Sequence, residues 1–348
     1  MKNNSTYIIG EIGQNHNGSV EIAKQMIDMA NQSVEEPVFN TTINTINAVK
    51  LTKRDLSEEL SISQMNMAYN SPNSFGKTYG EHRKFLELDN QEHFECYKYA
   101  KGKNLDFIET LCSKKCLSIL KLFEPDFLKV ASRDLTNLPL LEALSETKIP
   151  MIISTGMAGK KELDIALEII LKSHGNVSIL HCVSEYPTRP ENVNLNSISY
   201  LLKNYGTFTI GYSDHTIGIS AAVAAVAMGA KIIEKHITLD RKMKGTDHKG
   251  SLGPDGLNRL IRDIRILEKS MGKERIFISS SIIEVRNKLE RSIASNKKLN
   301  KGQIISKDDI HLLSPGNGIK WSNRAKIIGR EVKNQIEKNE IIYPEDLD

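Results

Sequence analysis

Short apolar runs rich in β-branched residues alternate with longer amphipathic stretches through most of the chain. The run from Tyr7 to Ile12, for example, leads into a polar loop and then into a stretch with helical periodicity from Val20 to Ala30. Apolar runs of this length suit strands that are buried on both faces, as parallel strands are. The pattern therefore predicts a regular alternation of strands and helices.

The same strand, loop and helix unit recurs eight times. Strands are predicted at residues 7–12, 46–51, 105–110, 127–130, 150–154, 177–182, 207–212 and 231–235. Helices are predicted at 20–30, 91–102, 113–123, 138–145, 160–173, 195–203, in the small-residue stretch between the last two strands, and at 255–271. Eight such units predict a closed (β/α)8 TIM barrel. A doubly wound open sheet is the alternative, but no Gly-x-Gly-x-x-Gly pattern follows the first strand.

Two stretches depart from this alternation. Residues 33–45 are polar and without period, which predicts an insertion before the second strand. Residues 52–90 are rich in Ser, Asn, Pro and Gly and predict a long loop. A loop of that length in a compact domain is usually a lid or a substrate loop.

The composition changes after Met271, where short apolar segments are broken by Gly, Asn and Pro. We expect a barrel domain at 1–272, a linker at 273–288 and a small β-rich domain at 289–348. A domain of that size is marginally stable by itself. It is therefore expected to dock on something larger.

The composition of the 348 residues is that of a soluble globular protein, with 39% hydrophobic and 26% charged residues. The formal net charge of +4 is small, and no Lys/Arg block with interleaved aromatic residues occurs, so nucleic acid is not an expected partner. No apolar run approaches the length of a membrane span.

The four cysteines are irregularly spaced and no apolar signal segment precedes Ile8, which predicts free thiols and a cytoplasmic location. The spacing of Cys112 and Cys116 lacks a second half, so a structural zinc site is not expected.

Polar residues gather where the predicted strands end. Active sites of (β/α)8 barrels lie at the carboxyl ends of the strands. The residues at or just after these ends are Glu11, Lys50, Thr110, Lys129, Ser154, Ser184, Tyr186, Ser213, His215 and His236. We expect them to converge on one mouth of the barrel.

His215 and His236 follow neighbouring strands. Two neutral imidazoles side by side suit a divalent metal ion. The simpler alternative is that each histidine only caps its strand by hydrogen bonding. The presence of Asp214 beside His215, and of Asp247 a short loop later, favours the metal site.

Lys50 and Lys129 each end an apolar run. A lysine tolerates partial burial best when it meets an anion, although such a side chain can also extend to solvent. Grouped with hydroxyls, the two lysines indicate a phosphate or carboxylate pocket. The hydroxyl-bearing members of this group are Thr110, Ser132, Ser154 and Ser213. A ligand with both anionic groups beside a divalent metal indicates a small phosphorylated acid.

Several ordered motifs extend this pattern over nearly the whole chain. They are Glu11-Ile-Gly-Gln-Asn-His-Asn-Gly18, Tyr79-Gly-Glu-His82, Ser154-Thr-Gly-Met157, Tyr186-Pro-Thr, Gly211-Tyr-Ser-Asp-His215, Glu234-Lys-His236 and Gly245-Thr-Asp-His-Lys-Gly-Ser251. With these motifs the chain resembles the bacterial sialic acid (nonulosonic acid) synthase family. The carboxyl-terminal domain resembles that family's antifreeze-like (SAF) domain, through the segments 289–294, 301–302, 308–310 and 315–316.

The resemblance implies a reaction, in which phosphoenolpyruvate condenses with an N-acetylmannosamine-type sugar to give a nine-carbon nonulosonic acid and phosphate. It implies that His215 and His236 hold Mn²⁺ or Mg²⁺, and that Glu11 either helps to deprotonate the attacking water or stabilises the positive charge at C2. It assigns phosphoenolpyruvate to Lys50, Thr110, Lys129, Ser132, Ser154, Ser184 and Ser213. It assigns the sugar to Asp134, Tyr186 and Asp247, and it implies a domain-swapped homodimer.

The chain also departs from the family's pattern. Cys112 stands in Thr-Leu-Cys where Thr-Pro-Phe is usual, Ala131-Ser132 replaces Gly-Ser, and Ser184 replaces a common Asn. Ser314 replaces the arginine of the appendage's Arg-Pro-Gly, and Arg291 is a candidate to compensate for it. The expected metal and phosphoenolpyruvate positions are kept. These differences favour a modified acceptor sugar, such as a legionaminic- or pseudaminic-type precursor.

Two other functions remain open at this point. A noncatalytic carbohydrate-binding relative would keep the barrel without the chemistry, although the intact lysines and histidines argue against it. Aldolase chemistry through a Schiff base would require Lys50 or Lys129 to react with a carbonyl substrate.

Overall fold

The computed structural model describes residues 5–36, 41–43 and 46–348. The chain divides into two compact units, residues Met1–Gly272 and Lys273–Asp348. Each is described by itself.

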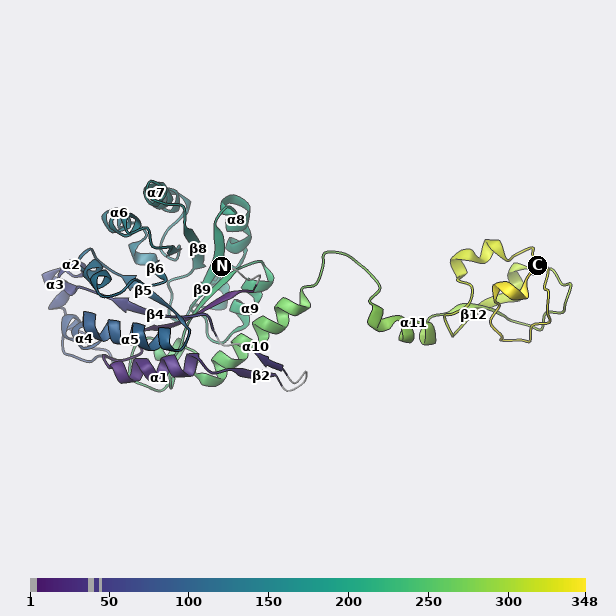
Figure 1. Cartoon of the computed structure of the whole chain (residues 1–348), viewed down its shortest axis with the longest axis horizontal. Coiled ribbons are helices and arrows are strands. Elements are labelled where there is room, and N and C mark those ends of the chain that lie inside the picture. The colour runs from purple at the N-terminus through teal and green to yellow at the C-terminus, as the bar shows by residue number, and fades with distance from the viewer. Residues whose placement is uncertain (1–4, 37–40, 44–45) are drawn as a thin grey trace. The chain divides into compact units, whose positions relative to one another are not determined.

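The first unit is built on a closed barrel of eight parallel strands, in the order β1-β10-β9-β8-β7-β6-β5-β4 (Figure 1). The strands are β1 (Tyr7–Gly13), β4 (Ala48–Lys53), β5 (Asp106–Leu111), β6 (Phe127–Val130), β7 (Met151–Ser154), β8 (Val177–Cys182), β9 (Thr209–Asp214) and β10 (Ile232–His236). The predicted (β/α)8 barrel is confirmed, and the open-sheet alternative is wrong because β1 pairs with both β4 and β10.

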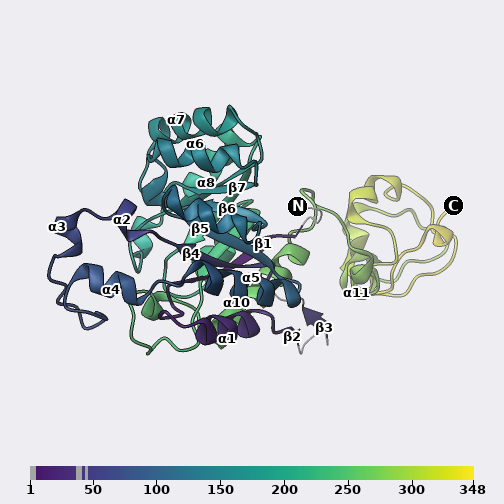
Figure 2. The ribbon, with the colours of Figure 1, turned by 60° about the vertical axis from the view of Figure 1, so that its left-hand side comes forward.

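Helices cover the outside of the barrel, and Figure 2 shows α6, α7 and α8 along one of its sides. The covering helices are α1 (Val20–Ala30), α5 (Asn90–Gly102), α6 (Leu138–Glu146), α7 (Lys160–Leu171), α8 (Asn196–Tyr205), α9 (Ser220–Ala227) and α10 (Pro254–Ser270). Their buried aliphatic residues form one core with the outward-facing residues of the strands. The helix predicted at 113–123 is instead a 3-10 segment at Lys115–Lys121. Pro125 follows closely, and a proline disfavours helical conformation in the residue before it.

The segment 33–45, predicted as an insertion before the second barrel strand, has secondary structure of its own. Its described parts form a two-stranded antiparallel ribbon of β2 (Val34–Glu36) and β3 (Thr41–Ile43). Val34 and Ile43 pair across the ribbon and are both buried, so these two apolar positions fix its inner face. Residues 37–40 and 44–45 lie outside the described residues.

The segment 52–90 was predicted as a loop, and that prediction is wrong in part. It contains three short helices, α2 (Leu56–Glu59), α3 (Ile62–Met65) and α4 (Tyr79–Phe85). Asp55, Ser61 and Thr78 cap their amino ends through side-chain oxygens. The small polar residues that indicate a loop therefore serve here as helix caps.

Side chains inside the barrel change from apolar to polar toward the carboxyl ends of the strands. Ile9, Ala48, Ile108, Ile152, Leu180 and Ile232 belong to an apolar cluster inside the barrel. Two residues further along the same strands come Glu11, Lys50, Thr110, Ser154, Cys182 and Glu234. Because side chains alternate with period two along a strand, these residues share the inner face. The apolar layer closes the barrel, and the polar layer forms the floor of a cavity.

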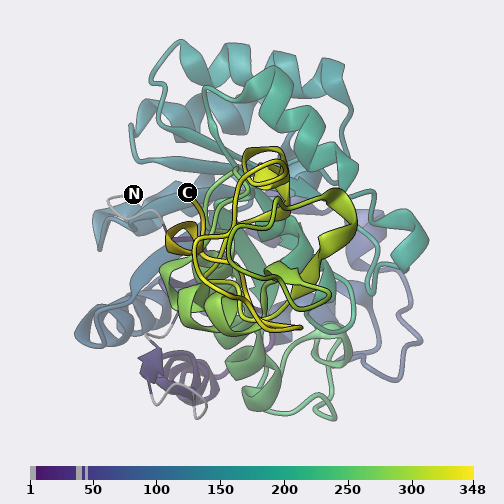
Figure 3. The ribbon, with the colours of Figure 1, turned by 90° about the vertical axis from the view of Figure 1, so that its right-hand side faces the viewer.

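The second unit contains an antiparallel pair, β11 (Ser292–Ser295) with β12 (Ile310–Leu313), and many turns (Figure 3). Its own core is aliphatic and includes Ile293, Ile310 and Ile342. The segment predicted as a linker carries a short helix, α11 (Ile283–Leu289). Among the described residues of the chain, no helix is long and apolar enough to cross a membrane.

Candidate active site

A cavity of about 420 Å³ opens at the carboxyl ends of the barrel strands. All but one of the site residues predicted from sequence line it. They are Glu11, Lys50, Thr110, Lys129, Ser132, Ser154, Ser184, Tyr186, Ser213, His215, His236 and Asp247. Asp134 is not among the lining residues, and its carboxylate instead accepts a hydrogen bond from Arg133 Nε at 3.2 Å. The convergence of the others follows from the parallel register, since each stands at the same end of its strand.

Lys50 lies between two buried carboxylates. Its Nζ is 2.8 Å from Glu11 Oε2 and 3.6 Å from Glu234 Oε2, and Ser213 Oγ donates to Glu234 at 2.8 Å. Burial raises the pKa of Glu11 to about 7, an effect that Lys50 opposes and Glu234 reinforces. Burial would also raise the pKa of Glu234, but Lys50, Lys129 and the Ser213 hydroxyl together lower it to about 2. One carboxyl is thus held ionised while its neighbour can exchange a proton near neutral pH.

Lys129 has a different environment. Its Nζ donates to Ser154 Oγ at 2.6 Å and to the backbone oxygen of Val130 at 2.9 Å. Only 2% of Lys129 is exposed, and no carboxylate within the described part of the chain forms a salt bridge with it. Burial lowers the pKa of this ammonium group, an effect that the Glu234 carboxylate opposes and Lys50 reinforces. A buried cation without an ion-pair partner is a ready place for an anion.

Gly156 brings three polar side chains together. Its amide donates to Ser132 Oγ at 3.0 Å. A Cβ at this position would lie 2.5 Å from Ser184 Oγ, 2.7 Å from Ser132 Oγ and 2.9 Å from Cys182 Sγ. Only glycine leaves room for these side chains to meet beside the lysines.

The two histidines come together as predicted, with ring centroids 5.5 Å apart. His215 Nδ1 lies 2.8 Å from the Val183 carbonyl oxygen, which can only accept, so this nitrogen is the donor and the bond orients the ring. His236 Nδ1 is buried without a hydrogen-bond partner among the described residues. Burial lowers the pKa of His236 below its usual value, so its ring is neutral. The Tyr186 ring packs on His215 with centroids 4.0 Å apart.

This pair fits a divalent metal ion. Imidazoles are common metal ligands, and a hydrogen bond from the second ring nitrogen, such as the one from His215 to Val183, orients a ligand of this kind. Within the described residues no group of three His, Cys, Asp or Glu side chains is arranged to hold a metal. The protein would therefore supply the two imidazoles and leave the other coordination positions to water and substrate oxygens.

The cavity also contains residues that the sequence analysis did not single out. Glu234 and Cys182 belong to the polar layer, and the period-two pattern of their strands could have identified them. Arg54, Arg83 and Arg133 line the cavity as well. They come from segments between the strands, where no periodicity indicates the direction of a side chain.

Fold and cavity together define a (β/α)8 barrel whose mouth carries an anion-accepting pocket beside a pair of histidines. The chain belongs to the NeuB family, which matches residues 41–276, and a SAF domain matches residues 290–348.

The chain is similar to proteins from several kingdoms. It is 33% identical over 343 residues to the N-acetylneuraminate-9-phosphate synthase of Homo sapiens, covering 98% of this chain and 92% of that protein. It is 34% identical over 328 residues to the N,N'-diacetyllegionaminic acid synthase of Legionella pneumophila, covering 93% and 89%. A solved structure of N-acetylneuraminic acid synthetase from Leptospira borgpetersenii, in complex with citrate, superposes with a TM-score of 0.66 at 33% identity, covering 82% of this chain and 92% of that one.

Proposed function

We propose that the chain condenses phosphoenolpyruvate with the aldehyde of an open-chain amino sugar, giving a nine-carbon nonulosonic acid and phosphate. The observation that carries the proposal is the buried, unpaired ammonium of Lys129 in the same cavity as His215 and His236. The names of the relatives, which are synthases of N-acetylneuraminate 9-phosphate and diacetyllegionaminate, give the product class.

Phosphoenolpyruvate would lie on the polar layer of the barrel. Lys129 and Lys50 are suited to its phosphate and carboxylate groups, because both are buried and neither reaches bulk water. Hydroxyl donors surround them, and these are Thr110, Ser132, Ser154, Ser184 and Ser213. Several polar groups that converge from separate strands fix both the position and the direction of a small ligand.

Glu11 would handle the proton of the reaction. C3 of phosphoenolpyruvate forms a bond to the aldehyde carbon, water adds at C2, and phosphate leaves with its bond to carbon broken. A pKa raised by burial to about 7 lets Glu11 take the proton of that water near neutral pH. Until Glu11 accepts this proton it carries a negative charge, and Lys50, 2.8 Å away, stabilises that charge.

The sugar aldehyde would lie between the lysines and the histidine pair. His215 and His236 would hold a divalent metal, Mn²⁺ or Mg²⁺, and such an ion polarises a carbonyl oxygen as a Lewis acid. Tyr186 and Asp247 line the same cavity and are assigned to the hydroxyls or the amide of the sugar.

Phosphate release tests the function. The full chain should release phosphate from phosphoenolpyruvate only when an amino sugar and Mn²⁺ or Mg²⁺ are both present. His215→Ala should abolish release without loss of the circular dichroism spectrum, because the ring lies at the mouth and outside the apolar core. The proposal is wrong if no N-acetylmannosamine, diacetamido-trideoxyhexose or mannose acceptor supports release.

We also propose a homodimer that works in the cytoplasm. The beginning of the second unit exposes Ile276, Phe277, Ile278 and Leu289, each more than half exposed. Contiguous apolar residues of this kind mark interaction surfaces. Light scattering of the full chain should give twice the mass of 39.0 kDa, and a monomer at micromolar concentration would contradict the proposal.

A further inference from the structure

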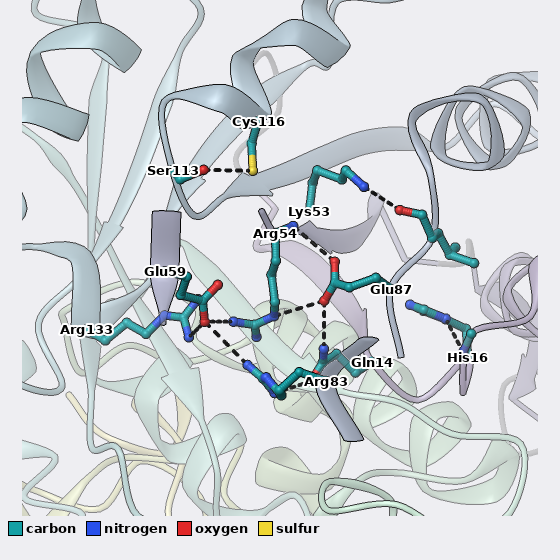
Figure 4. Close-up of polar contacts among 12 residues, drawn as sticks. Gln14, His16, Lys53, Arg54, Glu59, Arg83, Glu87, Ser113, Cys116 and Arg133 are labelled. Carbon is teal, nitrogen blue, oxygen red and sulfur yellow. Dashed lines mark hydrogen bonds and ion pairs between the residues drawn. The ribbon is translucent and has the colours of Figure 1, made fainter. Parts of the chain in front are cut away.

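Three arginines meet at one carboxylate beside the cavity (Figure 4). Glu59 Oε1 lies 2.7 Å from Arg133 Nη1, 2.8 Å from Arg54 Nη1 and 3.6 Å from Arg83 Nη2. All three guanidinium groups line the cavity, and Glu59 ends the short helix α2. Burial raises the pKa of Glu59, but the three guanidinium groups outweigh it and hold the pKa below its usual value.

The cluster keeps unused hydrogen-bond donors although three carboxylates surround it. Besides Glu59, Glu87 Oε1 lies 3.5 Å from Arg54 Nε, and Asp134 Oδ2 accepts from Arg133 Nε at 3.2 Å. Each guanidinium carries five N–H groups, so these carboxylates do not use all of the donors. Arg83 is 9% exposed, and its Nε makes no hydrogen bond to any residue that the structure describes. Its Nη1 donates to Gln14 Oε1 at 2.7 Å. Burial lowers the pKa of Arg83, and Arg54 and Arg133 lower it further. Unused donors on guanidinium groups that line the cavity can bind a further oxyanion.

The position of the cluster follows from the strand order. Arg54 follows β4 and Arg133 follows β6, on either side of β5. In the closed order of eight strands, β5 stands opposite β9, and β6 stands opposite β10. His215 follows β9 and His236 ends β10. A ligand whose aldehyde lies at the histidines therefore extends across the mouth toward the arginines.

We propose that Arg54, Arg83 and Arg133 form a subsite for an oxyanion, a phosphate or a carboxylate, that the acceptor sugar carries at the end away from its aldehyde. Glu59 occupies this subsite in the absence of the acceptor and leaves it when the acceptor binds. This inference rests on the proposed function and narrows its substrate to anionic amino sugars. The alternative is a permanent structural role, in which Glu59 ties α2 to the barrel.

Paired acceptors separate these two roles. The full chain is assayed with N-acetylmannosamine, with its 6-phosphate and with N-acetylmannosaminuronic acid, which place a neutral group, a phosphate or a carboxylate at the same carbon. We expect kcat/KM to be at least about tenfold higher for one of the two anionic acceptors than for the neutral acceptor. The difference should lie in KM, because each charge-assisted hydrogen bond to an arginine stabilises the bound acceptor. The preferred anionic acceptor shows whether the subsite binds a phosphate or a carboxylate.

Arginine variants then test the named residues. In Arg133→Gln and in Arg54→Gln, the ratio of kcat/KM for the anionic acceptor to kcat/KM for the neutral acceptor should fall about tenfold or more. The value of kcat/KM for the neutral acceptor itself should change by less than about twofold. Arg189→Gln is the matched control, because Arg189 follows β8, is 74% exposed and does not line the cavity. Glu59→Gln should lower KM for the anionic acceptor, since it removes the competing charge.

The inference is overturned if neutral and anionic acceptors are used equally well, or if the arginine variants lower both by the same factor, as a structural role requires. Failure of the proposed function gives a different result, which is no turnover with any acceptor. In that case calorimetry decides the subsite: wild-type protein should bind N-acetylmannosamine 6-phosphate or the uronic acid, and Arg133→Gln should not. Equal binding by both proteins overturns the inference.

Discussion

Lys235 Nζ and Asp214 Oδ2 lie 2.7 Å apart, and each of the two residues is 1% exposed. Asp214 directly precedes His215, and Lys235 directly precedes His236. Since neighbouring residues of a strand point to opposite faces, this ion pair joins β9 to β10 on the side away from the cavity. Asp214 also accepts from the Thr216 amide at 2.8 Å, which fixes the chain on the far side of His215.

This ion pair should position the histidines. Lys235→Met leaves the Asp214 carboxylate buried without its cation, a change that costs about 3–5 kcal/mol of the free energy of unfolding. We also expect activity to fall, because both histidines lose a fixed neighbour. Urea unfolding measures the first effect and phosphate release the second. Lys231→Met, an exposed lysine just before the same strand, is the control and should change stability by about 0.5 kcal/mol or less. Similar stability of the two variants would contradict the assigned role.

The carboxyl of Glu11 should determine the acidic side of the pH profile. With its pKa raised to about 7, the group is protonated and inactive as a base below that pH and ionised above it. We therefore expect kcat/KM for phosphoenolpyruvate to rise as the pH increases through about 7. Glu11→Gln should lose this dependence together with about a hundredfold or more of the rate. A flat profile between pH 6 and 8, or one kept by the variant, would show that another group is the base.

Gly156→Ala should weaken phosphoenolpyruvate binding. The new methyl group would lie 2.5 Å from Ser184 Oγ and 2.7 Å from Ser132 Oγ, so both hydroxyls must move. Overpacking of this kind costs about 1–3 kcal/mol, and we expect KM for phosphoenolpyruvate to rise about tenfold. In the control variant Gly175→Ala the nearest atom to the added Cβ is 4.0 Å away, and no change is expected. Unchanged KM in Gly156→Ala would argue against contacts between these serines and the substrate.

The barrel could be predicted because its signals are local. Each strand is a short apolar run and each helix a periodic stretch, so counting the units was enough to predict closure. The ribbon of β2 and β3 was missed because its apolar signal reduces to Val34 and Ile43 within a polar segment. The short helices of residues 52–90 were missed because helices of four to seven residues are too short to show a period, although the cap at Thr78 is a local sequence signal.

The cavity could be predicted only where the residues stand on strands. Strand direction places Lys50, Lys129 and His236 at one mouth without further information. Arg83 and Arg133 reach the cavity from a helix and a 3-10 turn outside the strands, so their convergence on Glu59 depends on tertiary packing. Tertiary packing also keeps Asp134 out of the cavity lining, because its carboxylate accepts a hydrogen bond from the neighbouring Arg133.

Mass spectrometry of the reaction product tests the central claim most directly. The full chain is incubated with phosphoenolpyruvate, Mn²⁺ and an amino-sugar acceptor, and the masses of the new compounds are measured. We predict a nine-carbon-chain acid whose mass equals that of both substrates plus water less phosphate. Pyruvate and phosphate with the acceptor unchanged would mean hydrolysis without carbon–carbon bond formation, and would contradict the account.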